Sequence, residues 1–391
     1  MKSSRENPVL RFSVPYVTGD EIEYIKDVIA SKNFAGNGPY TKKAQALIES
    51  RIGVRKVLLT HSCTAALEMS ALLLGVGPGD EVIMPSYTFC STASAFARTG
   101  CTIAFCDIDP ATMMADPADI ERRITPNTKA IVPVHYGGLA CQIEEIAALA
   151  QRHEIALVED AAQGFDAAVN GRPLGTFGTF GCISFHETKN LHAGLCGALY
   201  VNEDDPELQE RAIRIWERGT NRQAVLKGVI DKYSWTDLGS SFYPSELQAA
   251  FLLAQLEHAD ENKLERQTLY ARYANPLRAL ADKGAFTFPP MPQSLDTNYH
   301  ACYVIFDSVA DCDRVRETLK RAGIHAYIGY VPLHSSPMGL KLGNKPDDVP
   351  VTEALAPRTL RLPFHNDMTE ADVDRVVDLM RQCFADHHAH V

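Results

Sequence analysis

The sequence predicts an α/β protein, with a mostly parallel seven-stranded sheet in a large domain and a smaller α+β domain after it. Between residues 55 and 202, short and nearly continuous apolar runs alternate with helix-like stretches. Strands buried on both faces of a parallel sheet have this composition. Residues 203–280 then change to long amphipathic helical patterns, and strand-like and helix-like segments alternate again beyond them. We therefore expect a large domain over 1–255, N-terminal segment included, and a smaller one over 256–391.

The sheet is expected to use the apolar runs of the first part. They are KVLLT (56–60), DEVIMP (80–85), TIAFCDI (102–108), KAIVPVH (129–135), IALVED (155–160), GCISFH (181–186) and GALYVN (197–202). Helical patterns such as TAALEMSALLLG and QIEEIAALAQRHE stand between them. This alternation is typical of βαβ units.

The C-terminal domain is expected to follow a long bridging helix over residues 245–284. After the Pro-rich stretch 286–294 the expected order is a strand, a helix, a strand and a last helix. The corresponding segments are 299–307, 311–323, 325–334 and 369–386.

Composition excludes several classes of function. The net charge is -11, which argues against nucleic-acid or anionic-membrane surfaces because these need clustered Lys and Arg. The ten cysteines are spread singly without a C-x-x-C pair, so buried reduced thiols are favoured and no metal site is expected. The first residues lack a signal-peptide core, and no apolar run is long enough to cross a membrane. We expect a cytoplasmic protein.

Ligands of an open parallel sheet bind at the carboxyl ends of its strands. Ser62, Cys63 and Thr64 follow the first strand and lead into a helix. A helix N-terminus with hydroxyl groups suits a phosphate, although N-capping by Ser62 or Thr64 explains the same residues. After the second strand, Tyr87 and Phe89 offer faces for a planar ring, or belong to the core.

Two further strand ends carry charged side chains. Asp160 ends an apolar strand, and Gln163 follows it; a buried carboxylate there needs a cationic or hydrogen-bonding partner, or it caps the next helix. Lys189 lies just beyond the strand GCISFH. A lysine at such a position is either a surface residue whose amine reaches solvent or a desolvated amine that forms imines. Together these strand ends match the needs of pyridoxal phosphate.

The motifs HSCTAAL, MPSYTFCSTA, VEDAAQ, SFHETKN and SELQAA resemble those of the DegT/DnrJ/EryC1/StrS family of sugar-nucleotide aminotransferases. The resemblance covers nearly the whole chain. It implies the aspartate-aminotransferase fold, fold type I of the pyridoxal-phosphate enzymes. It also implies pyridoxal 5′-phosphate as cofactor, with pyridoxamine 5′-phosphate as its intermediate form.

The resemblance assigns roles by position. Lys189 would form the imine with the cofactor, Asp160 would pair with the ring nitrogen, and Gln163 would approach the ring hydroxyl. The remaining cofactor contacts would be Phe89 on the ring and, on the phosphate, Cys63, Thr64 and Ser184. Many members place an Asn on the phosphate of the neighbouring subunit, and the matching position here is Ser241. A site shared in this way implies a homodimer.

The substrate contacts are less defined. His186 and Glu187 lie beside the lysine and either touch the sugar diphosphate or hold the loop or the dimer interface. His334, with Tyr330 nearby, occupies a Pro-Leu-His turn that the family places near the pocket. Arg222 is a candidate for the diphosphate or for a surface ion pair. The stretch AGLCGALYV departs from the family's Gly-Glu-Gly-Gly turn, and this leaves the exact sugar open.

The implied reaction is ping-pong transamination from L-glutamate to a nucleotide-linked keto-sugar. A 4-keto-6-deoxy sugar, dTDP-4-keto-6-deoxy-D-glucose, is the expected acceptor. The alternatives are an aminotransferase for a 3-keto or other keto-sugar nucleotide, and a catalytically idle regulatory protein that keeps the cofactor pocket. A sugar 3-dehydratase is disfavoured because that group replaces the lysine with His, whereas this chain has Lys189.

Overall fold

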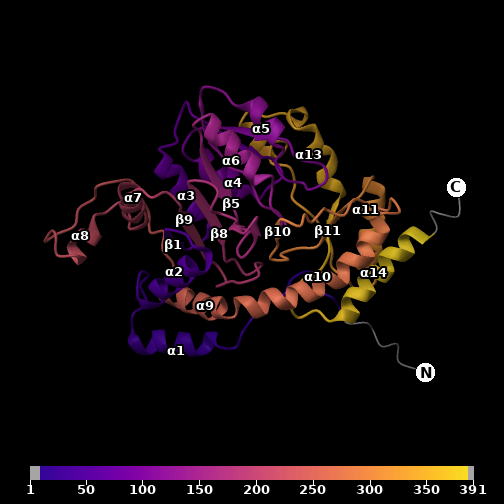
Figure 1. The fold of residues 1–391 in the computed structure, drawn as a ribbon, viewed down its shortest axis with the longest axis horizontal. Helices are drawn as coiled ribbons and strands as arrows, with labels where there is room; N and C mark the ends of the chain where they lie inside the picture. The colour runs from indigo at the N-terminus through magenta and orange to yellow at the C-terminus, as the bar shows by residue number, and fades with distance from the viewer. Residues whose placement is uncertain (1–8, 386–391) are drawn as a thin grey trace.

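The computed structural model describes residues 9–385 (Figure 1). Residues 1–8 lie outside this range, and the expectation about a signal peptide concerns them. Asp386, the expected end of the last helix, also lies outside it. No helix within the described residues is both long enough and apolar enough to cross a bilayer.

The seven predicted strands form one sheet, in the order β1-β9-β8-β5-β4-β2-β3. They are β1 (Lys56–Thr60), β2 (Glu81–Pro85), β3 (Thr102–Cys106), β4 (Thr128–Ile131), β5 (Ala156–Asp160), β8 (Phe180–Ser184) and β9 (Gly197–Val201). Only β9 pairs antiparallel with its neighbours, β1 and β8. The α/β fold with a mostly parallel sheet is thus confirmed. The carboxyl ends of β5 and β8, which carry Asp160 and Ser184, lie side by side because these strands are parallel neighbours.

Helices cover both faces of this sheet (Figure 1). Successive side chains of a strand point to opposite faces, so Leu58 packs in a cluster with α3 (Cys63–Leu74) and α7 (Pro206–Trp216). Val57 and Leu59 belong to a second cluster, with α2 and α9. The other helices of this part are α1 (Glu21–Ser31), α2 (Pro39–Ile52), α4 (Cys90–Ala97), α5 (Pro117–Arg123), α6 (Ile143–Arg152), α8 (Arg222–Leu226) and α9 (Glu246–Glu257).

The expected bridging helix is two helices, α9 and α10 (Ala259–Ala281), which meet at His258 and run along one side of the molecule (Figure 1). Beyond them a three-stranded sheet has the order β11-β13-β12. Its strands are β11 (Tyr303–Ile305), β12 (Tyr327–Ile328) and β13 (Thr359–Arg361). The other elements of this part are α11 (Val309–Arg321), α12 (Pro337–Lys341), α13 (Pro350–Leu355) and α14 (Glu370–Ala385). A small sheet of β6 (Ala168–Val169), β7 (Arg172–Pro173) and β10 (Leu295–Asp296) joins the two parts.

The C-terminal part has its own apolar cluster, built from α10, α11, α14 and the β11-β13-β12 sheet. Leu10 belongs to this cluster. Its N–H donates to the carbonyl of Gly323 (2.9 Å), and Phe364 N–H donates to the carbonyl of Phe12 (3.2 Å). Residues 10–12 therefore pack with the C-terminal part, although the expected division assigned them to 1–255. The boundary near residue 255 stays a prediction.

Candidate active site

A cavity of about 510 Å³ lies at the carboxyl ends of the central strands and is lined on another side by the C-terminal part. Its volume is in the range of small-molecule and cofactor sites. It brings together nine of the predicted site residues, namely Cys63, Thr64, Phe89, Asp160, Gln163, Ser184, His186, Lys189 and Tyr330.

The start of helix α3 forms one end of the cavity. Ser62 is the N-cap, and its hydroxyl accepts the N–H of Ala65 (3.1 Å). The N–H groups of Cys63 and Thr64 stand in the first turn, where a helix supplies no acceptor, and both residues line the cavity. Gly197 of β9 lets this turn approach closely, because a Cβ there would lie 2.5 Å from the backbone nitrogen of Cys63. The turn suits a phosphate group.

Asp160 presents a buried carboxylate to the cavity. One oxygen accepts from the Thr92 hydroxyl (2.7 Å) and the other from Ala162 N–H (3.2 Å). No helix begins after Asp160, since β5 is followed by turns, so the helix-capping alternative does not hold. Burial raises the pKa of Asp160, and the Thr92 hydroxyl partly offsets this. A ring N–H⁺ would supply the cationic partner that a buried carboxylate needs.

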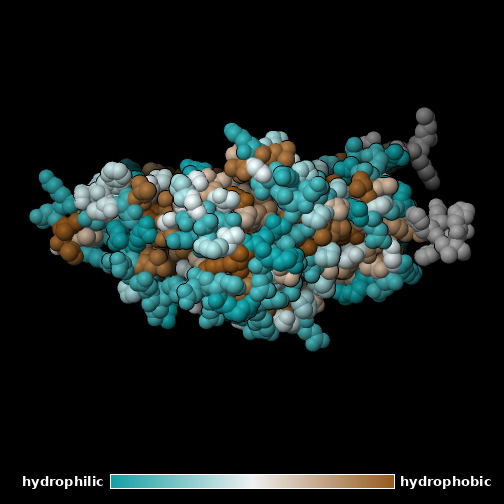
Figure 2. Space-filling view, turned by 90° about the horizontal axis from the view of Figure 1, so that it is seen from above, coloured by the Kyte–Doolittle hydropathy of each residue, from teal (hydrophilic) through white to brown (hydrophobic). Residues whose placement is uncertain are grey.

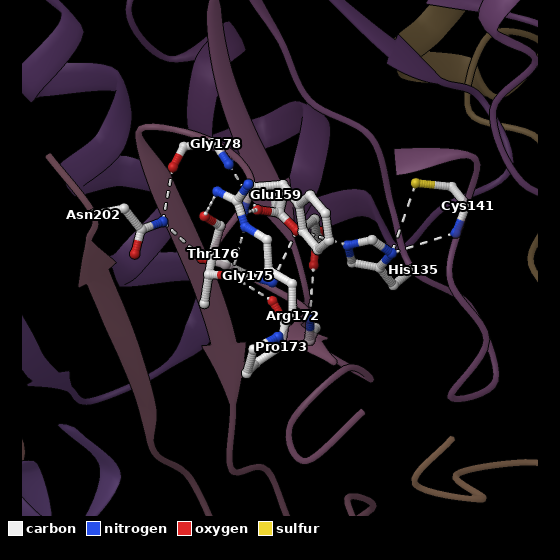
Figure 3. A network of polar contacts seen from close by, with 12 residues as sticks. His135, Cys141, Glu159, Arg172, Pro173, Gly175, Thr176, Gly178 and Asn202 are labelled. Atoms are coloured by element: carbon white, nitrogen blue, oxygen red, sulfur yellow. Dashed lines mark hydrogen bonds and ion pairs between the residues drawn. The ribbon is translucent and has the colours of Figure 1, made fainter. Parts of the chain in front are cut away.

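A second polar network is built around Glu159, the residue before Asp160 in β5 (Figure 3). The Glu159 carboxylate accepts the N–H groups of Gly175 (2.8 Å) and Gly178 (2.9 Å), and lies 3.0 Å from His135 Nε2. Burial opposes charge on His135, but Cys141 and the Glu159 carboxylate raise its pKa to about 10. His135 also lines the cavity, so its cationic form favours the ionised state of Asp160. The strand-end argument could have selected His135, which ends the run KAIVPVH.

Lys189 lies in the turn after β8, where its N–H donates to the carbonyl of His186 (2.8 Å). Its side chain lines the cavity together with Asp160. Burial lowers the pKa of Lys189 to about 8. The charge of Arg361 also lowers this pKa, whereas Cys63 and Asp160 raise it. A much larger share of this amine is therefore neutral near pH 7 than for an exposed lysine, as a nucleophile or general base requires.

Gln163 and the aromatic residues form a side wall. Gln163 Oε1 accepts the N–H of Gly137 (2.7 Å), and its Nε2 donates to the Tyr330 hydroxyl (2.9 Å). Phe89 is 57% exposed, and its ring centre lies 6.4 Å from that of Tyr330. Tyr87 is buried and packs edge-on against Tyr330. The exposed face of Phe89 is therefore the one available for a planar ring.

Four predicted residues lie outside the cavity lining: Glu187, Arg222, Ser241 and His334. His334 is fully buried. Its Nδ1 lies 2.7 Å from the Ser86 hydroxyl and its Nε2 lies 3.1 Å from the Pro346 carbonyl oxygen. The structure thus gives His334 a linking position between the C-terminal part and the end of β2, away from the cavity.

The other three are on the surface. Glu187 is exposed beside the cavity-lining His186, whose pKa is lowered by burial and by Lys189. Arg222 begins α8, and Ser241 pairs with Glu217 where the same excursion of the chain returns. Both are exposed on a projecting arm, residues 217–241 (Figure 1).

Two further basic side chains line the cavity, Arg361 of β13 and His300, and no pattern in the sequence identifies them as site residues. Asn190 donates through Nδ2 to the Asn298 carbonyl (2.7 Å), which leaves its Oδ1 to accept from His300 Nδ1 (2.9 Å). The Nε2 of His300 is then unprotonated. Burial lowers the pKa of His300 well below its ordinary value, which keeps the ring neutral.

The comparisons with known proteins agree with this site. The model of the DegT/DnrJ/EryC1/StrS aminotransferase family matches residues 15–381. The chain is 31% identical to a dTDP-4-dehydro-2,3,6-trideoxy-D-glucose 4-aminotransferase of Saccharopolyspora spinosa, over 96% of each chain. It is 30% identical to a GDP-perosamine synthase of Caulobacter vibrioides, over 96% of this chain and 98% of the relative.

Among solved structures, the aminotransferase TlmJ of Streptoalloteichus hindustanus superposes with a TM-score of 0.88 at 31% identity, over 97% of this chain and 99% of the other. The buried carboxylate, the desolvated lysine and the free helix N-terminus fit a pyridoxal phosphate ring, aldehyde and phosphate. The chain belongs to the DegT/DnrJ/EryC1/StrS aminotransferase family, and it is a sugar aminotransferase that depends on pyridoxal 5′-phosphate.

Proposed function

We propose that the protein moves an amino group from L-glutamate to the keto carbon of dTDP-4-keto-6-deoxy-D-glucose, giving a 4-amino-4,6-dideoxy sugar nucleotide. The observation that carries the aminotransferase chemistry is the desolvated amine of Lys189 in one cavity with the buried carboxylate of Asp160. Amination at C4 is supported by the similar 4-aminotransferase. The motifs SCTA, MPSYTF, PVHY and SFHETKN also resemble those of dTDP-4-amino-4,6-dideoxygalactose transaminase.

The cavity has a residue suited to each part of the cofactor. Asp160 would hold the ring nitrogen, and Phe89 would cover the ring. Gln163 would bind the ring hydroxyl through its remaining amide N–H. The first-turn N–H groups of α3 and Ser184, whose side chain is buried at the end of β8, would hold the phosphate. When bound, pyridoxal phosphate stabilises negative charge on the substrate carbon beside the reacting nitrogen.

Lys189 carries the proton in both halves of the reaction. It takes the proton from the α-carbon of L-glutamate, and it later delivers a proton to the sugar carbon that receives nitrogen. A group that serves as base and then as acid works best with a pKa near the working pH. The value of about 8 for Lys189 meets this condition, whereas the ordinary lysine value does not.

We also infer a homodimer. The projecting arm exposes Leu226, Val229, Tyr233, Trp235 and Leu238 by 58–74%, and Figure 2 shows hydrophobic residues at the end of the molecule where α8 lies. Contiguous exposed apolar side chains of this kind mark interaction surfaces. If a second copy covered this arm, Ser241 and Arg222 would lie close to the cavity of that second copy, as the family resemblance implies.

The dimer is tested by analytical ultracentrifugation of the wild type and of Trp235→Asp. We expect a dimer that the substitution weakens, and a monomeric wild type would contradict the inference.

A cytoplasmic location is proposed as well. It is supported by the ten cysteines, all within the described residues and all free thiols, as in a reducing compartment.

The reaction is tested by incubating the cofactor-loaded protein with L-glutamate and a panel of keto-sugar nucleotides on dTDP, UDP and GDP. We expect release of 2-oxoglutarate that depends on the 4-keto sugar and is absent with Lys189→Ala. Release that depends only on a 3-keto sugar or on a GDP sugar would replace the proposed acceptor. A loaded protein that responds to no amino donor would favour the idle regulatory protein.

A further inference from the structure

His300 presents an unused hydrogen-bond acceptor to the cavity. The residue is 7% exposed and lines the cavity. Its Nδ1 lies 2.9 Å from Asn190 Oδ1, whereas its Nε2 has no hydrogen-bond partner among residues 9–385 and is not closed off from solvent. Polar atoms of buried side chains are normally hydrogen-bonded. The free Nε2 therefore indicates a group that a ligand supplies.

A chain of hydrogen bonds fixes which ring nitrogen of His300 carries the hydrogen. The Asn298 carbonyl can only accept, so Asn190 donates to it through Nδ2 (2.7 Å) and turns its Oδ1 to His300. The Nδ1 of His300 must then carry the hydrogen, and Nε2 keeps its lone pair. The backbone of His300 is held as well, because Arg266 donates to its carbonyl (2.8 Å). Asn190 thus sets His300 as an acceptor.

The surroundings keep His300 in this neutral form. Burial lowers its pKa well below the ordinary value, and the charges of Lys189, Arg361 and Arg266 lower it further. An ionised carboxylate or phosphate offers only lone pairs, and a free Nε2 cannot donate to them. The ligand group at Nε2 must therefore be a hydrogen-bond donor, an O–H or an N–H.

The two substrates of the proposed reaction differ in the donors that they offer. L-Glutamate has two carboxylates and one nitrogen, and this nitrogen is the atom that is transferred. The sugar of dTDP-4-keto-6-deoxy-D-glucose has hydroxyl groups on C2 and C3, and only C3 is bonded to the keto carbon. His300 is close enough to Lys189 for the charge of the amine to lower its pKa, and its partner Asn190 directly follows Lys189 in the chain. These positions favour the hydroxyl group beside the reacting carbon.

We propose that His300 Nε2 accepts a hydrogen bond from the C3 hydroxyl of the sugar, and that the protein thereby selects acceptors with a hydroxyl group beside the keto carbon. The inference rests on the proposed function, because it concerns the 4-keto sugar. Asn190 is a positioning residue, since it acts on the sugar only through His300. A sugar without this hydroxyl leaves Nε2 unpaired in a site that excludes water, and it should react more slowly for this reason.

The first comparison needs only the wild type. The cofactor-loaded protein receives saturating L-glutamate and either dTDP-4-keto-6-deoxy-D-glucose or its 3-deoxy analogue, and release of 2-oxoglutarate gives kcat/KM for each sugar. We expect the 3-hydroxy sugar to be preferred about 10- to 100-fold. Equal values, or a preference for the 3-deoxy sugar, would overturn the inference and leave the proposed aminotransferase reaction standing. No turnover of either sugar would refute the proposed function itself, and this inference with it.

Two variants then separate the roles of the two ring nitrogens. His300→Asn keeps an amide N–H near the position of Nδ1 and has no atom at Nε2, whereas His300→Gln can place its amide oxygen near the position of Nε2. We expect His300→Asn to lose the preference for the 3-hydroxy sugar and His300→Gln to keep part of it. His365→Asn is the matched control, because His365 is also buried but does not line the cavity, and its preference should match that of the wild type. Melting temperatures are recorded for all variants, so that a loss of folding is seen separately.

The second readout is the absorbance change of the cofactor-loaded protein when L-glutamate is added without a sugar. The amino donor has no hydroxyl group, so we expect His300→Asn to respond like the wild type. A folded His300→Asn protein that keeps the wild-type preference between the two sugars would overturn the inference. A folded His300→Asn protein that responds to L-glutamate much more slowly would also overturn it, because His300 would then act in the proton transfer that both halves of the reaction share.

Discussion

Replacing Lys189 with methionine should stabilise the cofactor-free protein while removing its activity. Burial lowers the pKa of Lys189 from 10.5 to about 8. The ammonium is therefore less favourable in the folded state than in the unfolded chain. Since one pKa unit corresponds to about 1.4 kcal/mol, protonated Lys189 costs the folded state about 3 kcal/mol. Methionine fills similar space without a charge.

The pH dependence gives the effect its sign. Below about pH 8 the amine is protonated in both states, and the full cost is present. Between about pH 8 and about pH 10.5 the unfolded chain binds more protons, so the stability of the wild type rises with pH. The advantage of Lys189→Met should thus be largest near neutral pH and disappear above about pH 10.5.

Urea unfolding of the cofactor-free proteins at about pH 7 and about pH 10.5 measures this difference. Lys227→Met, which changes an exposed lysine of the projecting arm, is the control and should show no pH-dependent gain. An advantage of Lys189→Met that is the same at both pH values would refute a desolvated amine, because it would come from packing alone.

Three further predictions concern the cofactor contacts and the fold. Asp160→Asn should weaken binding of pyridoxal phosphate about 10- to 100-fold, since a charge-assisted contact is lost; an absorbance titration with unchanged affinity would contradict this. Gly197→Ala places a methyl group 2.5 Å from the Cys63 nitrogen and should weaken binding of pyridoxal phosphate by displacing the start of α3. A variant whose titration curve matches that of the wild type would disprove this. His334→Ala should lower the free energy of unfolding by about 1–3 kcal/mol because Ser86 loses its partner, with kcat unchanged; a loss of kcat at wild-type stability would place His334 at the substrate.

The strands and the residues at their ends could be predicted because both depend on local sequence. A buried parallel strand is a continuous apolar run, and the carboxyl ends of such strands meet at one edge. Asp160 and Lys189 were found in this way. The same argument pointed to Gln163, to which the family resemblance gave a role, and the resemblance added Ser184; all four lie in one cavity.

Arg361 could not be found by the same argument. Arg358 and Arg361 lie three residues apart in RTLRLP, and nothing in this short stretch shows which of them faces the cavity. Arg361 does so because it ends β13, which pairs with β11 and β12. His334 shows the reverse case. His334 follows the cavity-lining Tyr330 closely in the sequence. Its ring is nevertheless held by the Ser86 hydroxyl, which is 248 residues away in the sequence. Contacts across such distances are set by tertiary packing rather than by a local pattern.

The proposed reaction moves nitrogen from L-glutamate to C4 of a dTDP-linked sugar, and it needs Lys189 to move the protons. The most direct measurement supplies ¹⁵N-labelled L-glutamate and dTDP-4-keto-6-deoxy-D-glucose to the cofactor-loaded protein and locates the label by NMR. We expect ¹⁵N on C4 of the sugar with the wild type and none with Lys189→Ala. Label at another carbon, or an amino sugar formed by Lys189→Ala, would contradict it.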